Sequence, residues 1–238
     1  MTEKPVPFYP LVSIARLSKL LVGLLIAGVV LAIVGIGSGL MERTVLAQVA
    51  AVQEGGTEGN TIDLEALVAS AESSDTRQIV VGVIQTAVSI ATIAIFLRWI
   101  YLSARNCHVV TGRKLQFSPG WSIGWYFIPI MNLWKPYQAM RQTWNVSENK
   151  IDAPERPAPG LLLAWWLLFL ISDAIGRVSF KQAMRADEIS ELQTSNLTTI
   201  LSDAVSIPSA IAAIFVVAGI ARMQASNFVD GSEAAELH

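Results

Sequence analysis

The side chains that usually perform chemistry are few in this sequence and poorly spaced for it. The chain of 238 residues has one cysteine and two histidines. Cys107 and His108 are adjacent and the other histidine is His238, which gives no metal-ligand spacing. Two histidines leave no credible serine–histidine–acid set, and the sequence contains none of the glycine-rich motifs that bind phosphates. We therefore expect a protein that is not an enzyme and that needs no cofactor or metal.

Basic and aromatic residues gather instead around one uncharged stretch, residues 115–134. Lys114 and Lys135 flank it, and it contains three of the chain's seven tryptophans. Its length is enough to cross a bilayer, but Pro119 and Pro129 would interrupt a helix twice. The stretch is therefore predicted to be a re-entrant or interfacial segment and not an ordinary spanning helix.

The chemistry that this region offers is binding. Trp121 and Trp125 are four residues apart and share a face if that piece is helical. They either anchor the segment at the membrane interface or form the walls of a groove for a lipid chain or a partner helix. Asn132 is expected to hydrogen-bond the backbone that Pro129 leaves free. The candidate lipid- or partner-binding residues are Trp121, Trp125, Asn132, Trp134, Lys135, Tyr137, Arg141 and Trp144.

A second helix is predicted to begin at Lys135, because a proline in the first helical turn is well tolerated. Its pattern predicts an amphipathic helix that lies on the membrane, with basic residues near the lipid headgroups. Those charges are either ordinary positive-inside charge or part of a headgroup or phosphate site. The expected apolar face holds Tyr137, Met140 and Trp144, and the polar face holds Gln138, Arg141, Gln142 and Asn145.

The elements that position this region are predicted to be membrane-spanning helices. Apolar residues make up 53% of the chain, charged residues 15%, and the mean hydropathy is +0.49. A bilayer core provides no water for the backbone, so long apolar segments there must be helical. Asp173 and Arg177 lie four apart within the third segment and are interpreted as a structural ion pair. The predicted spans are Leu20–Met41, Ile79–Leu97, Leu161–Phe180 and Ala204–Ala221.

The predicted fold class is an all-α polytopic integral membrane protein. Its four transmembrane helices would form two hairpins around the central Pro/Trp-rich segment. The expected parts are a cytoplasmic N-terminal segment (1–19), a hairpin with an acidic outer loop (20–102), the aromatic module with the amphipathic helix and a proline-rich linker (103–159), a second hairpin (160–222) and a C-terminal tail (223–238).

The placement of lysine and arginine predicts that both termini are cytoplasmic. If residues 115–134 return to the side they left, twelve of the 17 basic residues fall on inner segments: Lys4, Arg16, Lys19, Arg98, Arg105, Arg113, Lys114, Lys135, Arg141, Lys150, Arg156 and Arg222. If the stretch crossed the membrane, the inner and outer counts would become about equal, and the positive-inside bias would vanish. Charge therefore favours the re-entrant or interfacial interpretation.

One run of residues resembles a known family. Residues 117–144 contain the pattern SPGW…GW…P…NLWKPYQ…W, which is similar to the core of the bacterial family called domain of unknown function 4328. The flanking helices, about residues 79–224, match this family in hydropathy only. The resemblance implies a bacterial integral membrane protein, and it implies no activity, substrate or catalytic residue.

These observations lead us to expect an accessory or scaffold subunit of the bacterial inner (plasma) membrane. It would dock membrane lipids, a membrane protein partner or a second copy of itself through the aromatic module, and it would not bind nucleic acid. One alternative is a small transporter or channel with Asp173, Asn132 and Lys135 as polar waypoints. Another is a membrane enzyme that acts on lipids, with Lys135, Arg141 and Tyr137 around a headgroup.

Overall fold

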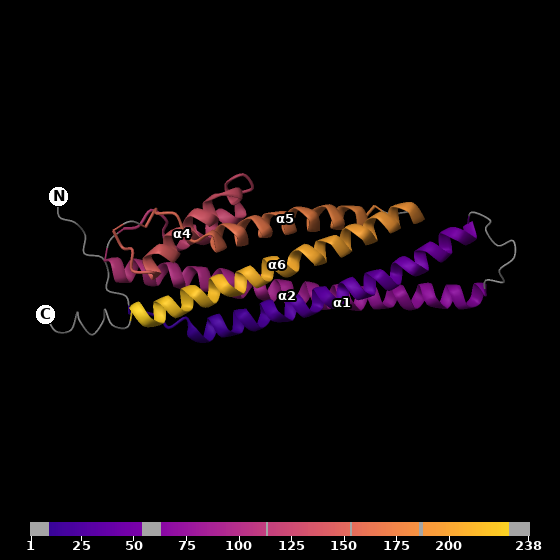
Figure 1. The fold of residues 1–238 in the computed structure, drawn as a ribbon, viewed down its shortest axis with the longest axis horizontal. Coiled ribbons are helices and arrows are strands. Elements are labelled where there is room, and N and C mark those ends of the chain that lie inside the picture. The colour runs from indigo at the N-terminus through magenta and orange to yellow at the C-terminus, as the bar shows by residue number, and fades with distance from the viewer. Residues whose placement is uncertain (1–9, 54–62, 113, 153, 186–187, 229–238) are drawn as a thin grey trace. The chain divides into compact units, whose positions relative to one another are not determined.

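The computed structural model describes residues 10–53, 63–112, 114–152, 154–185 and 188–228, and within these ranges all regular structure is helical. Four long helices are each long and apolar enough to cross a membrane (Figure 1): α1 (Ala15–Gln53), α2 (Leu64–Thr111), α5 (Gly160–Ala183) and α6 (Ile189–Asn227). Between α2 and α5 lie α3 (Pro119–Gly124), the 3₁₀ helices η1 (Trp125–Phe127) and η2 (Met131–Leu133), and α4 (Lys135–Ser147). The predictions of an all-α fold and of a multi-pass membrane protein are confirmed at this level.

The long helices extend beyond the predicted spans. Helix α1 continues to Gln53, and α2 begins at Leu64, so much of the predicted outer loop is helical; residues 54–62 lie outside the described part. Asp63 caps α2, because its Oδ1 accepts the main-chain N–H groups of Glu65 and Ala66 at 3.1 and 3.2 Å.

Helix α6 also runs past its predicted end and reaches Asn227. The first residues assigned to the tail (223–238) are therefore helical, and residues from 229 onward lie outside the described part. Pro208 lies inside this helix, where the sequence also places it within a span.

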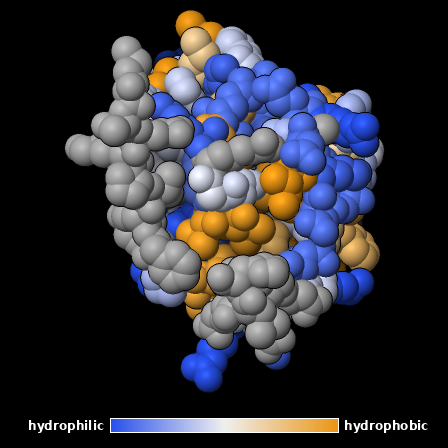
Figure 2. All heavy atoms as spheres, turned by 90° about the vertical axis from the view of Figure 1, so that its left-hand side faces the viewer, coloured by the Kyte–Doolittle hydropathy of each residue, from blue (hydrophilic) through white to orange (hydrophobic). Residues whose placement is uncertain are grey.

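The chain divides into two compact units, and each of the four long helices contributes to both. Unit 1 comprises Met1–Leu25, Ala91–Trp166 and Ala212–His238, and unit 2 comprises Ile26–Ile90 and Leu167–Ile211. All seven tryptophans belong to unit 1. The end of unit 1 that carries the last turns of α2 and α6 shows hydrophilic side chains around an apolar patch (Figure 2).

Unit 1 has a core of large apolar side chains. Trp99, Trp165 and Trp166 are all buried. Phe96 packs between Trp99 and Trp165, with ring centroids 6.0 Å apart in both pairs. The indole Nε1 of Trp99 donates to Ser18 Oγ at 2.8 Å, which fixes α2 to the start of α1. Such aromatic pairs stabilise a core beyond their buried area.

A buried carboxamide also joins three helices of unit 1. Gln224 of α6 accepts a hydrogen bond from Asn106 Nδ2 at 3.1 Å and donates to Ser103 O and Ser147 Oγ at 3.1 Å each. Asn106 in turn donates to the main chain of Val12 at 2.8 Å. The last turns of α6 are therefore held against α2 and α4 by hydrogen bonds that solvent does not reach.

Unit 2 has a different core, built from small and polar residues. Its buried apolar residues among those described are Ala32 and Leu67. Its buried polar residues are Ser38, Ser74, Ser179, Ser195, Asn196 and Ser209. Small and hydroxyl-bearing residues at helix contacts are typical of helices that pack inside a membrane, where apolar side chains gain little by leaving lipid.

Glycines of α1 bring α6 close within unit 2. A side chain at Gly39 would lie 2.7 Å from Ile200 Cγ1, and Asn196 Nδ2 donates to the Gly39 carbonyl at 3.0 Å. Gly35 and Gly39 are four residues apart, the spacing that allows close helix approach in membranes.

Candidate functional site

The uncharged stretch folds as a series of short turns, as its prolines predict. Ser118 caps α3, with its Oγ accepting the main-chain N–H of Trp121 at 3.3 Å, and Pro119 occupies the first turn. The helical path stops at Ile128, which is extended (φ −100°, ψ 109°), the conformation favoured before a proline. A further turn, η2, then leads to α4.

A carboxamide of α4 holds the beginning of this stretch. Gln142, which is 4% exposed, accepts the N–H of Phe117 through Oε1 and donates through Nε2 to the Phe117 carbonyl, both at 3.0 Å. His108 of α2 donates to the same carbonyl from Nε2 at 2.9 Å. These bonds tie the chain just after Lys114 to the helix that begins at Lys135.

The two lysines that flank the stretch consequently line one groove. Lys135 Nζ lies 5.5 Å from the ring centroid of Phe117 and 5.8 Å from that of Trp125, within range of cation–π attraction. The rings of Trp121 and Trp125 pack with centroids 4.6 Å apart. The groove has a volume of about 400 Å³ and is lined by Lys114, Leu115, Gln116, Phe117, Ser118, Trp121, Trp125 and Lys135.

The middle of the stretch presents a cluster of exposed apolar side chains. Phe127 is 71% exposed, Ile130 68% and Leu133 53%. These residues form the tip of the stretch, residues 127–133. A side chain of α5 holds the tip in place, since Trp166 Nε1 donates to the Leu133 carbonyl at 2.9 Å. Large apolar side chains exposed on neighbouring turns are suited to contact with another apolar surface.

Tyr126, immediately before this tip, points inward. Its ring packs edge-on against Trp166 and Phe96, with centroids 6.1 and 6.5 Å away. Its hydroxyl is buried without a hydrogen-bond partner. Burial raises the pKa of Tyr126 well above its usual range, so this phenol stays neutral and acts as a packing group.

Of the eight candidate binding residues, Trp121, Trp125 and Lys135 line the groove, and the other five do not. The expected role of Asn132 is wrong: its Oδ1 is buried without a partner, and the turn around Pro129 is closed by main-chain bonds. The N–H of Asn132 donates to the Ile128 carbonyl at 2.8 Å. Trp134 is 40% exposed at the start of α4, and Tyr137 is half-buried in the first turn of the helix.

Helix α4 begins at Lys135 as predicted, but two of the four residues predicted to form its polar face are buried. Gln142 and Asn145 are buried, and Asn145 Nδ2 donates to the carbonyls of Pro154 and Arg156 at 2.9 and 2.7 Å. These carboxamides therefore fix the start of the stretch and the proline-rich linker. The helix is therefore packed inside unit 1 through side chains that the sequence pattern assigned to its polar face.

The two remaining candidate residues of α4, Arg141 and Trp144, do not line the groove. Trp144 lies against Gly219 of α6, where an added side chain would come within 2.9 Å of its ring. Arg141 has a buried Nε without a partner.

Sequence reasoning passed over two residues that organise the groove. Phe117 supplies the ring beneath Lys135, and Gln142 fixes the main chain of Phe117. Both lie in the run that resembles a known family, and that run was the one signal that could have drawn attention to them. The predicted pair of Asp173 and Arg177 is present, since Arg177 Nε donates to Asp173 Oδ2 at 2.8 Å.

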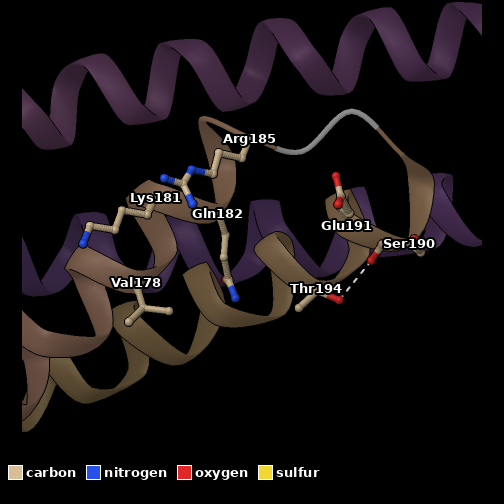
Figure 3. A pocket seen from close by; sticks show the side chains of 7 residues that line it. All are labelled: Val178, Lys181, Gln182, Arg185, Ser190, Glu191 and Thr194. Atoms are coloured by element: carbon tan, nitrogen blue, oxygen red, sulfur yellow. Dashed lines mark hydrogen bonds between the residues drawn. The ribbon is translucent and has the colours of Figure 1, made fainter.

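A second cavity lies in unit 2, where α5 ends and α6 begins (Figure 3). Its volume is about 470 Å³. The lining charges are of both signs, and Thr194 already donates its hydroxyl to the Ser190 carbonyl at 2.9 Å. The groove of unit 1 is therefore the better match for an anion. The second cavity is lined by Val178, Lys181, Gln182, Arg185, Ser190, Glu191 and Thr194.

A comparison with protein families matches residues 63–222, more than half of the chain, to the family described as Domain of unknown function (DUF4328). The chain belongs to this family. The residues that line the groove, the Gln142–Phe117 bonds and all of α3 to α5 fall within the matched residues. No curated protein and no solved structure matches the chain. The family resemblance seen in the sequence is thus confirmed, and the function has to be argued from the groove.

Proposed function

We propose that this DUF4328 protein is a non-enzymatic multi-pass protein of the bacterial inner membrane that docks lipid at its basic aromatic groove, as an accessory or scaffold subunit. One observation carries the proposal. Lys114 and Lys135, at the two ends of the uncharged stretch, line the same groove with Trp121 and Trp125.

This arrangement supports a stretch that enters the membrane and returns to its own side. Both of its ends reach one groove, and the exposed apolar residues lie between them at the tip. A crossing segment would instead separate its flanking lysines by the thickness of the hydrocarbon core, about 30 Å. We place both ends, and both termini, on the cytoplasmic face, in keeping with the positive-inside distribution.

The ligand class that fits best is an anionic phospholipid. Two ammonium groups at the membrane interface attract a phosphate, each by about 1 kcal/mol. The indole rings of Trp121 and Trp125 provide an apolar wall for the glycerol and upper acyl region. A soluble anion would use the lysines and leave that wall without a role.

We expect the double variant Lys114→Gln/Lys135→Gln to bind a short-chain phosphatidylglycerol about 10- to 30-fold more weakly, because two attractive charges of about 1 kcal/mol each are lost. Titration of the detergent-solubilised protein, followed by tryptophan fluorescence, measures this affinity. Short-chain phosphatidylcholine and inorganic phosphate are the comparison ligands.

The matched control removes two other positive charges of unit 1, by Arg16→Gln/Lys19→Gln. Phosphatidylglycerol affinity should be unchanged in this control. Equal losses in both double variants, or equal affinity for phosphatidylcholine, would show that the groove is not a specific lipid site. Binding of inorganic phosphate alone would assign the lysines to a soluble anion.

The alternatives find less support. A transporter would use Asp173 and Lys135 as polar positions along the transport path. Asp173 is already paired with Arg177, and Lys135 lies over two aromatic rings. A lipid enzyme needs a general acid or base at the headgroup. The residues that line the groove include no carboxylate and no histidine.

A further inference from the structure

A polar seam runs through unit 2 along α1, α2 and α6, which are otherwise apolar. It has two layers, and in each helix the residues of the two layers are seven apart, which is about two turns or roughly 10.5 Å. The first layer combines one carboxylate with two carboxamides from neighbouring helices, and the second combines one carboxylate with one carboxamide. The first layer contains Glu42, Gln78 and Asn196, and the second contains Gly35, Gln85 and Asp203.

The first layer is closely bonded but incomplete. Gln78 Nε2 and Asn196 Nδ2 both donate to Glu42 Oε2 at 2.7 Å, and Asn196 also donates to the Gly39 carbonyl at 3.0 Å. Asn196 is only 6% exposed, and its Oδ1 is buried with no partner. A buried acceptor without a donor is costly and calls for a bound group that satisfies it.

The second layer repeats this chemistry more loosely. Gln85 Nε2 is shared between Asp203 Oδ1 at 3.4 Å and the Leu31 carbonyl at 3.3 Å. Any side chain at Gly35 would collide with the Asp203 carboxylate and the Gln85 amide. The absence of a side chain at Gly35 thus lets the Asp203 carboxylate and the Gln85 amide approach the main chain of α1.

No basic side chain among the described residues neutralises Glu42 or Asp203. Arg77, the nearest cation along α2, donates to the hydroxyls of Ser38 and Ser74 at 3.0 Å each. Arg177 of α5 is paired with Asp173. Carboxylates that are partly buried between helices without a positive partner are costly and point to a bound cation.

We propose that this seam binds a monovalent metal cation in the Glu42 layer, with the Asp203 layer as a second position. Carboxylate, carboxamide and main-chain carbonyl oxygens are the ligands that hard cations prefer. Rotation of the Asn196 and Gln78 carboxamides by a half-turn replaces their N–H groups with oxygens facing the ion. One carboxylate per layer balances one positive charge. The site lies wholly in unit 2 and does not depend on the lipid groove.

Isothermal titration with NaCl, against N-methyl-D-glucamine chloride of equal ionic strength, tests this in nanodiscs of phosphatidylcholine. The wild-type protein should give a saturable heat with Na⁺ alone. Glu42→Gln keeps the side-chain shape and removes the charge, and we expect it to weaken Na⁺ binding at least about tenfold. Glu72→Gln, an exposed acid of α2 outside the seam, should leave the affinity unchanged.

Circular dichroism checks that each variant keeps its helices, and Asp203→Asn serves as a second probe of the seam if Glu42→Gln does not fold. The proposal is overturned if the wild type gives no saturable heat with Na⁺ or K⁺. It is also overturned if Glu42→Gln and Asp203→Asn both bind Na⁺ as the wild type does. A heat that depends on pH and is the same in NaCl and in N-methyl-D-glucamine chloride would show that the seam binds protons instead.

Discussion

Replacement of Gln142 by leucine is expected to destabilise unit 1 by about 2–4 kcal/mol. The substitution leaves one buried main-chain N–H without an acceptor and removes one of the hydrogen bonds to a buried carbonyl. Both groups belong to Phe117, and both meet the carboxamide of Gln142 at 3.0 Å. Unfolding in sodium dodecyl sulfate, followed by tryptophan fluorescence, measures the change. The signal reports on unit 1, which contains all seven tryptophans.

The matched control is Gln138→Leu, one turn earlier on α4 and half-buried. A substitution away from such a buried bond changes stability by no more than about 0.5 kcal/mol. The Gln142–Phe117 bonds also position the Phe117 ring beneath Lys135, so Gln142→Leu should weaken phosphatidylglycerol binding as well. Equal effects of the two substitutions on stability would show that the Gln142–Phe117 bonds contribute nothing specific.

Gly39→Leu is expected to destabilise unit 2 by about 3 kcal/mol, the upper range for forcing extra atoms into a close contact. The new side chain would begin 2.7 Å from Ile200 Cγ1, and it would push α6 away from the carbonyl that Asn196 bonds. Helical circular dichroism during titration with sodium dodecyl sulfate measures this loss, because unit 2 contains no tryptophan.

Gly37 provides the control on the same helix. A side chain there would meet nothing within 4 Å, and leucine is a better helix former than glycine by roughly 1 kcal/mol. Gly37→Leu should therefore be neutral or slightly stabilising. If both leucines cost the same, the contact of α1 with α6 would not depend on the missing side chain at Gly39.

The sequence was sufficient to predict the elements whose cause is local. A long apolar run in lipid must satisfy its own backbone hydrogen bonds and therefore forms a helix, and four such helices are present among the described residues. The two prolines of residues 115–134 likewise predict a broken path, and Ile128 is extended before Pro129. The start of α4 at Lys135 follows from Pro136 in its first turn.

Contacts between distant residues were beyond prediction, because polar side chains give the same pattern whether they face water or a buried main-chain group. Gln142 and Asn145 were assigned to a polar surface, yet both are buried against carbonyls that other segments supply. Asp203 stood just outside a predicted span and was passed over. Its relation to Gln85 and Gly35 exists only once three helices are aligned.

Thiol labelling at the two ends of residues 115–134 shows whether this stretch returns to the side of the membrane that it left. Gln116→Cys places an exposed thiol at the start of the stretch, and Glu148→Cys places one beyond its end, after α4; the native Cys107 is fully buried and serves as the blank. A membrane-impermeant maleimide should label both positions in inverted membrane vesicles and neither in intact spheroplasts. Labelling of the two positions from opposite faces would contradict the re-entrant path and, with it, the lipid groove that depends on its return.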